Sequence, residues 1–488
     1  MRTLTTVSYL INIGETARVY STGAAAYIAR AVSLDKKDLN VNKRTIIWIC
    51  LVLAALGLWM GVDAGAAQTV EFRVGAADKD ITPPVGIPMW GYGARHDAPS
   101  EGTLDPLMAK AIVIAAGADK VALVGIDLGR GPTEAMMKTI RDQIAAQAGI
   151  KHVLITGSHT HHGPVIELLD EPGLGRGKFD TAVAYAQKLP QLLVDAILAA
   201  DHDSKPARIG VLTESTTLNR NRHTKREPKA TDPMLAVVRF DDLEGKPIAI
   251  LVNFAAHPVM TQEKLLKYSA DYPGFLKKKV ERALTTKCVF MQGASGDMSP
   301  NPNPGPWEPR SFGETVADHV IALAQSATTA VPAHPSVSGV VDTFRFQTRV
   351  NLKDPRVAGV FERAYFPEIT RNYVQLYGDG LTAELNTVLL NGELALVGGS
   401  GEFFCNHANR LKARSYVKNT LFFGYCNGHG MYFPTIEAAS EGGYGADAGV
   451  SLVELGGGER MMDKALINIF TLQGKFARER RPDVDQNR

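Results

Sequence analysis

The chain has 488 residues, of which 45% are hydrophobic and 21% are charged, and its formal net charge at pH 7 is +2. This composition is typical of a globular protein and excludes a disordered chain and a multi-span membrane protein. A net charge this small gives no support for nucleic-acid binding.

The first 66 residues are expected to be an upstream extension and a signal peptide. A basic pair at 43–44 precedes an apolar run over 45–60, and the motif A-G-A follows at 64–66. These are the three parts of a secretory signal, so we expect cleavage after residue 66 and export to the periplasm or the medium. An uncleaved membrane anchor is the alternative, although the run is short for a span. We also expect translation to begin near Val41.

After the signal, short apolar runs alternate with helical stretches. A Gly- and Pro-rich segment at 70–93 should form a structured loop after a short strand. Buried strands are predicted at 121–127 and 153–155, and amphipathic helices at 133–148 and 180–200. This alternation predicts an α/β domain.

Strands become more frequent beyond residue 207. Further strands are predicted at 209–213, 235–240, 248–254, 288–292, 393–397 and 421–425, with strand-like segments around 337–352. Helices are predicted at 274–284, 313–325 and 403–417. We therefore predict one catalytic domain at 67–475, built on a mixed β-sheet core flanked by helices with the active site in strand-end loops, and a charged tail at 476–488.

The cysteines give no disulfide framework. Cys50 lies in the apolar run of the signal, which leaves Cys288, Cys405 and Cys426. This number is odd, although one pair could form in an exported protein.

Three histidines stand in four consecutive positions, His159, His161 and His162, directly after the strand predicted at 153–155. Alternate residues of an extended segment point the same way, so His159 and His161 could face one cavity. Single histidines are often surface or hydrogen-bonded residues. Three at the exit of one strand favour a metal or catalytic site, since ligands gather at the carboxyl ends of strands.

Candidate metal ligands also follow three other predicted strands, namely His257, Glu402 and the segment 429–432. Residues scattered in sequence but placed at strand ends can converge on one point of a fold. Alone, Glu402 could be a helix N-terminal acid and His257 a hydrogen-bonded turn residue. Together they supply the nitrogen and oxygen donors of a zinc site with an open position for water.

These motifs resemble those of the neutral (alkaline, non-lysosomal) ceramidase family, zinc amidases that split ceramide into sphingosine and a fatty acid. The matching stretches are GAADKDITPP with a later GYG, HTHHGP, NRNR, NFAAHP, SADYPG, GASGDMSPN, GGSGEF and GYCNGHGMYFP. They follow the order of the family and span nearly the whole mature chain.

The resemblance implies roles for individual residues. The family's zinc ligands fall on His159, His257, Glu402 and Tyr432. Its substrate contacts and reaction-centre residues fall on His161, Arg222 and Tyr444. Asp297 is expected to form a wall of the site and not to ligate metal. His162 stands where the family has a small residue and is not expected to be a ligand, and His429 and His407 are expected to be surface or outer residues of the site.

The chemistry implied is hydrolysis by a zinc-activated water. Zinc lowers the pKa of bound water and polarises the amide carbonyl. The oxyanion would be stabilised by zinc, by Tyr444, and by Arg222 or His161. The leaving amine needs a proton, for which His161 is the expected donor.

Three departures from the family bear on the substrate. HTKREP follows Arg222 in place of a Ser-Pro segment, and Glu437 is followed by two alanines in place of Glu-Tyr. The chain is also expected to lack the family's C-terminal immunoglobulin-like domain. These departures bear on long-chain ceramide as the substrate and leave the expected amide hydrolysis unaffected.

The leading hypothesis is an exported zinc-dependent amide hydrolase acting on ceramide or a related N-acyl lipid, with transient contact to a membrane surface and no nucleic-acid partner. The first alternative is a metallohydrolase of another N-acyl compound or an ester. The second is a non-catalytic envelope protein of the same fold. An apolar groove would favour the lipid substrate, and a small polar pocket would favour the first alternative.

Overall fold

The computed structural model describes residues 70–476. The predicted signal peptide and nearly all of the predicted tail lie outside these residues, and the predicted domain boundaries stay predictions. Among the described residues, no helix combines the length and apolar character that crossing a bilayer requires.

The larger of the two main sheets has eight strands in the order β13-β11-β10-β8-β1-β3-β4-β5. In chain order they are β1 (Phe72–Asp80), β3 (Met108–Ala116), β4 (Asp119–Ile126), β5 (His152–Gly157), β8 (Lys205–Ser215), β10 (Met234–Asp242), β11 (Pro247–Phe254) and β13 (Lys287–Gln292). The pairs β4–β5 and β11–β13 are parallel and the other neighbours are antiparallel. The sheet is mixed, as predicted.

A second sheet has four strands in the order β15-β16-β17-β19. They are β15 (Val337–Phe346), β16 (Leu381–Leu390), β17 (Leu394–Gly399) and β19 (Asn419–Phe423). Only β17 and β19 run parallel in this sheet.

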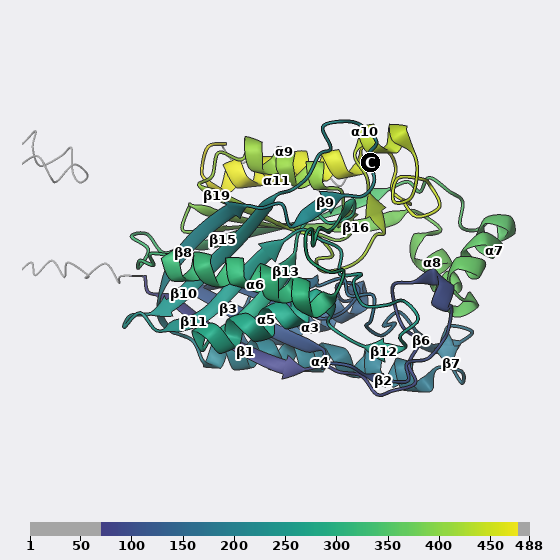
Figure 1. Cartoon of the computed structure of the whole chain (residues 1–488), viewed down its shortest axis with the longest axis horizontal. Helices are drawn as coiled ribbons and strands as arrows, with labels where there is room; N and C mark the ends of the chain where they lie inside the picture. Colours follow the sequence, from purple (N-terminus) through teal and green to yellow (C-terminus); the bar gives the residue numbers. More distant parts are fainter. Residues whose placement is uncertain (1–69, 477–488) are drawn as a thin grey trace, which may run out of the picture. The chain divides into compact units, whose positions relative to one another are not determined.

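Helices cover the outer faces of both sheets (Figure 1). On the eight-stranded sheet lie α3 (Glu134–Ala148), α4 (Asp180–His202), α5 (Asp271–Leu284) and α6 (Pro309–Ser326). On the four-stranded sheet lie α9 (Cys405–Arg414) and α11 (Gly457–Leu472). The described part of the chain is thus layered helix–sheet–sheet–helix, and the predicted α/β class with a helix-flanked mixed sheet is confirmed.

Successive side chains along each strand point to opposite faces of its sheet, which explains why one face packs on the other sheet and the other face packs on helices. In β4, Leu123 belongs to the core between the sheets, whereas its neighbour Val124 belongs to the core under the helices. Leu396 of β17 also lies between the sheets, while Val397 packs toward the outer helices. Strands buried on both faces read as continuous apolar runs. This is why they could be predicted from the sequence.

Smaller elements complete the structure. Short strands are β2 (Gly102–Thr103), β6 (Leu169–Pro172), β7 (Gly175–Arg176), β9 (Asn219–Asn221), β12 (Lys267–Tyr268), β14 (Met298–Pro300), β18 (Glu402–Phe403) and β20 (Tyr432–Phe433). Short helices are η1 (Gly93–Arg95), α7 (Pro355–Ala364), α8 (Pro367–Tyr377) and α10 (Ile436–Glu441).

Some predicted bounds were wrong. The segment predicted as helix from residue 403 begins as strand β18, because Glu402 and Phe403 pair with β20, and helix α9 starts only at Cys405. The strand-like segment predicted to residue 352 ends with β15 at Phe346. Cys288, Cys405 and Cys426 are buried free thiols, so the disulfide left open by the sequence is absent among the described residues.

The core between the sheets can be tested by truncating Leu396, which is 1% exposed. Leu396→Ala should lower the free energy of unfolding by about 2–5 kcal/mol, because it leaves a cavity between two rigid sheets. Val341→Ala, on β15 of the same sheet but 45% exposed, should change it by less than about 0.5 kcal/mol. Urea unfolding followed by circular dichroism measures both. Equal losses in the two variants would contradict this packing.

Candidate active site

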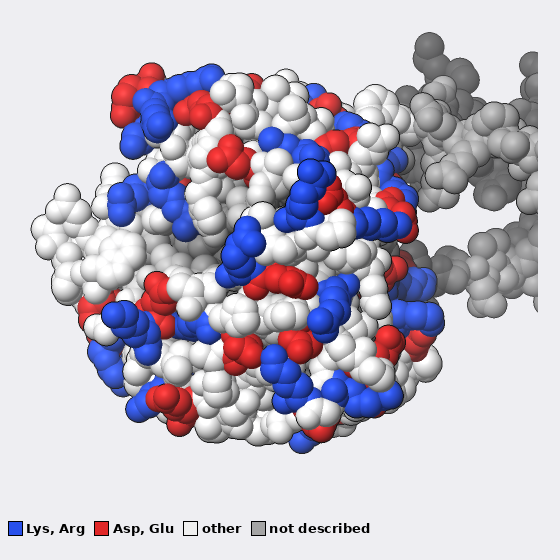
Figure 2. Space-filling view, turned by 90° about the vertical axis from the view of Figure 1, so that its right-hand side faces the viewer, with Lys and Arg blue, Asp and Glu red and all other residues white. Residues whose placement is uncertain are grey.

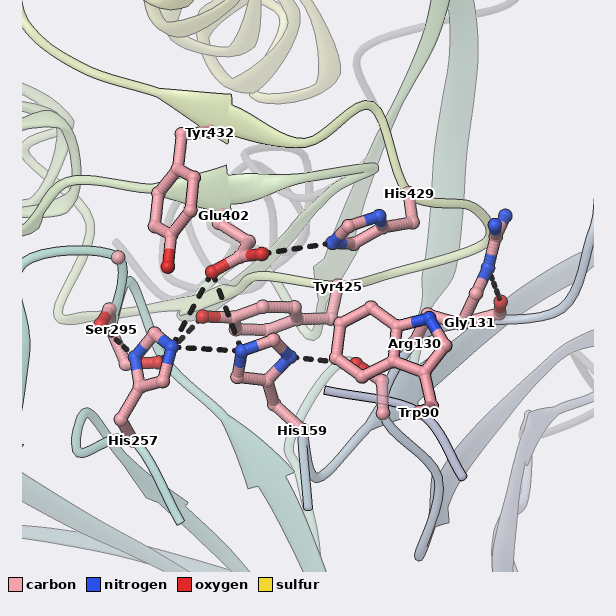
Figure 3. Close-up of polar contacts among 12 residues, drawn as sticks. Trp90, Arg130, Gly131, His159, His257, Ser295, Glu402, Tyr425, His429 and Tyr432 are labelled. Atoms are coloured by element: carbon pink, nitrogen blue, oxygen red, sulfur yellow. Dashed lines mark hydrogen bonds and ion pairs between the residues drawn. The ribbon is translucent and has the colours of Figure 1, made fainter. Parts of the chain in front are cut away.

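Four strands deliver the side chains of one buried cluster (Figure 3). His159 follows β5, His257 follows β11, Glu402 follows β17, and the segment with His429 and Tyr432 follows β19. The backbone of His159 has φ +68°. This left-handed conformation is unusual for a residue with a side chain and occurs often at functional sites.

The rings of His159 and His257 are held in one tautomer. The Nδ1 of His159 donates to the carbonyl of Gly129 over 2.6 Å, and that of His257 donates to the carbonyl of Ser295 over 2.7 Å. Since a carbonyl oxygen only accepts, the Nε2 atoms of the neutral rings present lone pairs, and they lie 2.8 Å apart. Lone pairs this close repel each other unless positive charge lies between or beside them.

Glu402 adds an oxygen to this cluster. Its Oε2 lies 3.3 Å from His159 Nε2 and 3.4 Å from His257 Nε2, and it accepts no hydrogen bond from the described residues. Its Oε1 accepts a hydrogen bond of 3.1 Å from His429 Nε2. Burial raises the pKa of Glu402, but the positive charge that His159 carries when it is protonated, together with hydrogen bonds from the surrounding imidazoles, holds this pKa well below its usual range.

Tyr432 is placed beside Glu402 because the two residues are partners in the parallel pair β18–β20. Its hydroxyl accepts a hydrogen bond of 3.2 Å from Nη2 of Arg222. Burial raises the pKa of Tyr432 well above its usual value, and the charge of Arg222 acts in the opposite direction. A nearby metal cation would further favour the phenolate.

His161 also points into the cluster. Its Nε2 lies 3.2 Å from His159 Nε2, and with His257 the three imidazoles place one nitrogen each within 4.8 Å of one another, as a metal ion requires. The Nδ1 of His161 has no partner among the described residues. Burial and the neighbouring histidines lower the pKa of His161 well below its usual value. His161 can therefore act as a third nitrogen donor to a metal ion or as a neutral base beside one.

The remaining predicted residues lie around this centre. Arg222 places Nη2 3.0 Å from His257 Nε2 and so brings positive charge to the lone pairs. Tyr444 is 70% exposed, and its ring centre lies 5.6 Å from that of Tyr432. Asp297 is buried and accepts hydrogen bonds from the Asn221 side chain and the Cys405 backbone, which places it in the wall of the site.

Two histidines lie apart from the cluster, and a third borders it. The Nδ1 of His162 lies 3.0 Å from the carbonyl of Lys267 and its Nε2 lies 2.8 Å from Arg95 Nη2, while burial and Arg95 lower its pKa to about 4. His407 packs on Phe403. His407 and His429 were expected at the surface or as outer residues of the site. They are only 1% and 5% exposed, so neither is a surface residue, and His429 is an outer residue that contacts the cluster through Glu402.

Several aromatic residues of the site were not predicted from the sequence. The Trp90 ring meets His159, His161 and His429 edge to face at 5.2, 5.8 and 5.3 Å, and its Nε1 donates to Glu167 over 3.0 Å. The Tyr425 ring stacks on His159 at 4.1 Å. These rings fix the imidazole planes by packing, so the converging Nε2 atoms have little freedom to turn.

The cluster opens into a cleft. Most of its lining is apolar or aromatic: Met89, Trp90, Tyr92, Val165, Tyr365, Phe366, Ile369, Tyr373, Met431, Tyr432, Tyr444 and Val450. One wall comes from α7 and α8, which project at the right of Figure 1. On the face drawn in Figure 2, Lys and Arg alternate with Asp and Glu and form no continuous field of one sign. Because most of the residues that line the cleft are apolar or aromatic, the cleft suits an apolar ligand.

The donors fit a zinc ion. Two imidazole nitrogens with fixed tautomers and one free carboxylate oxygen converge, and Tyr432 and His161 stand beside them. Zinc prefers nitrogen and oxygen ligands of this kind, and hydrogen bonds from the far side of each imidazole are typical of metal-binding histidines.

Comparison with known proteins gives concordant results. A family model described as neutral/alkaline non-lysosomal ceramidase, N-terminal, matches residues 72–310. Neutral ceramidase B of Dictyostelium discoideum is 26% identical over an alignment of 177 residues that covers 31% of this chain and 24% of that protein. The match thus spans about a quarter of the length of this relative.

Solved structures share the fold. Neutral ceramidase from Pseudomonas aeruginosa superposes with a TM-score of 0.69 at 19% identity, covering 83% of this chain and 75% of that one. A ceramidase complexed with C2 superposes with a TM-score of 0.67 at 18% identity, covering 86% and 78% of the two chains. The resemblance drawn from the motifs is confirmed over residues 72–310, which match the model of the N-terminal part of the neutral/alkaline non-lysosomal ceramidase family, and the fold agrees with this match.

Proposed function

We propose that this protein is a zinc-dependent amide hydrolase that cleaves the N-acyl bond of ceramide or a related N-acyl lipid. The observation that carries the proposal is the convergence of His159 Nε2, His257 Nε2 and Glu402 Oε2 at the base of an aromatic cleft. The apolar lining favours a lipid over a small polar substrate. A non-catalytic protein of the same fold would have no need of these buried, mutually repelling donors.

His159, His257, Glu402 and Tyr432 would hold the ion. When bound, Zn²⁺ would supply an acidified water and a Lewis acid for the amide carbonyl. We assign Glu402 as a ligand in preference to His161, because both Nε2 atoms lie near its unpartnered oxygen. His161 would then accept a proton from the attacking water and pass it to the leaving amine.

Two residues would stabilise the developing oxyanion. Arg222 carries a positive charge at the wall of the cluster, and Tyr444 lines the cleft with its ring beside that of Tyr432. Hydrogen-bond donors that already point to where negative charge develops lower the activation barrier, because they need not reorganise during the reaction. The aromatic rings around the cleft, among them Trp90 and Tyr365, would bind the alkyl part of the substrate and exclude water.

The metal site is tested by His159→Ala and Glu402→Ala. Each should lose the bound zinc and abolish turnover, because each removes one of the converging donors. The measurements are metal content of the purified protein and release of fatty acid from a fluorescent short-chain ceramide, with and without a chelator. His161→Ala should keep the zinc and lose turnover.

A matched control is His162→Gln, in the same turn but directed toward Lys267 and Arg95. It should keep both zinc and turnover. Full activity of Glu402→Ala would show that the assigned ligand set is wrong. Bound zinc without ceramide hydrolysis in the unmodified protein would redirect the proposal to another N-acyl compound or an ester.

The role of Tyr444 is tested by removing its hydroxyl. Tyr444→Phe should keep the zinc and lower kcat by about 10²-fold, the usual effect of losing one oxyanion donor. Zinc content and steady-state kinetics on the same short-chain ceramide measure both quantities. Unchanged kinetics would remove Tyr444 from the mechanism.

We also propose that the protein is exported through the segment at 43–66 and meets its substrate at a membrane surface. The basic pair, apolar run and A-G-A motif support export. N-terminal sequencing of the protein recovered from the native cells should begin at Ala67. A chain that still carries the apolar run would instead support an uncleaved anchor.

A further inference from the structure

Tyr444 stands on a segment that has little conformational preference of its own. Residues 442–445 read Gly-Gly-Tyr-Gly, and the three glycines have φ of +66°, +90° and +87°. Left-handed backbone is accessible to glycine at little cost, and glycine also keeps many other conformations open. Something outside this segment must therefore hold the Tyr444 ring beside Tyr432.

Glu441, the last residue of α10, is bound by three consecutive residues of the loop that follows Arg222. The Thr224 hydroxyl lies 2.9 Å from both carboxylate oxygens of Glu441, and the Lys225 backbone N–H donates to Oε2 over 3.0 Å. The Arg226 Nε lies 3.1 Å from Oε1. Although it lies at the surface, the Glu441 side chain is only 14% exposed.

The same loop reaches the next residue along the chain. The Nε2 of His223 donates to the carbonyl of Gly442 over 2.8 Å, and the His223 ring packs edge to face on Phe404. The Cβ positions that Gly443 and Gly445 lack would lie 4.0 Å from the His223 ring and 3.2 Å from the Phe404 ring. The glycine-rich segment thus rests on residues that the loop and α9 hold in place.

This loop is anchored in turn to the wall of the active site. The Oδ1 of Asn221 accepts from the backbone N–H groups of His223 and Thr224, over 2.8 and 2.9 Å. The amide of Asn221 donates to Asp297 over 2.8 Å, and the Arg222 N–H donates to the Asp297 carbonyl over 2.8 Å. A continuous chain of hydrogen bonds therefore joins Asp297 to the carboxylate of Glu441.

We propose that Glu441 is a positioning residue: bound by Thr224, Lys225 and Arg226, it fixes residues 442–445 so that the Tyr444 hydroxyl faces the reaction centre. The HTKREP segment, expected from the sequence to alter substrate contacts, would act through Tyr444 and not by touching substrate. This inference rests on the proposed role of Tyr444 in catalysis. A misplacement of about 1 Å at such a donor is enough to cost much of its effect.

The test compares Glu441→Ala with Glu437→Ala in the full chain. Glu437 lies on the same short helix and binds Arg410 of α9 over 2.7 Å, a contact that does not involve the glycine-rich segment. Glu441→Ala should speed hydrogen–deuterium exchange of the amides at 442–447 and lower kcat by about 10- to 100-fold, with KM and zinc content little changed. Glu437→Ala should leave these quantities unchanged.

Two further comparisons separate positioning from a general loss of structure. In a Tyr444→Phe background, Glu441→Ala should cause no additional loss of kcat, since the group that it positions is gone. Thr224→Val should reproduce part of the loss, and Thr224→Ser should restore it.

Unchanged exchange at 442–447 in Glu441→Ala would overturn the proposal. So would an equal loss of kcat in the presence and absence of the Tyr444 hydroxyl, because Glu441 would then act elsewhere. Wild-type kinetics of Tyr444→Phe alone would contradict the proposed role of Tyr444, and the exchange experiment would still decide whether Glu441 holds the segment.

Discussion

The structure depends on one electrostatic constraint, the burial of lone pairs that face one another. The Nδ1–H groups of His159 and His257 each donate a hydrogen bond to a backbone carbonyl. This leaves the two Nε2 atoms 2.8 Å apart beside a carboxylate oxygen of Glu402. Such an arrangement is costly in a dry interior unless a cation compensates it. The surrounding fold can be understood as the scaffold that keeps these donors together.

The two packed sheets provide this scaffold. His159 and His257 follow strands of the eight-stranded sheet, whereas Glu402 and Tyr432 lie in the pair β18–β20, whose strands follow β17 and β19 of the four-stranded sheet. The cluster therefore lies where the strand ends of both sheets meet. A core packed between two sheets resists relative displacement, because close-packed side chains leave few voids. Rigid donors on strand ends form the centre of the site, and Tyr444 stands on the glycine-rich segment 442–445 at its rim.

The sequence predicted the residues at the centre of the site better than those that line the cleft. Apolar runs ending shortly before His159, His257 and Glu402 indicated the strands that bring these three side chains together, because central strands are apolar on both faces. Helices α7 and α8, which line the cleft, were missed, although Asp354–Pro355 and Pro367 are recognisable helix starts. Trp90 and Tyr425 lie in turns without periodicity, and the contact of His429 with Glu402 spans 27 residues, so only the folded chain reveals them.

The most direct test of the account is a crystal structure of the protein with data collected on both sides of the zinc absorption edge. The account predicts a single anomalous peak about 2.0–2.2 Å from His159 Nε2, His257 Nε2 and Glu402 Oε2, with Tyr432 beside it. A peak coordinated by His161 while Glu402 stays outside, or the absence of a peak from this cluster in zinc-loaded protein, would contradict it.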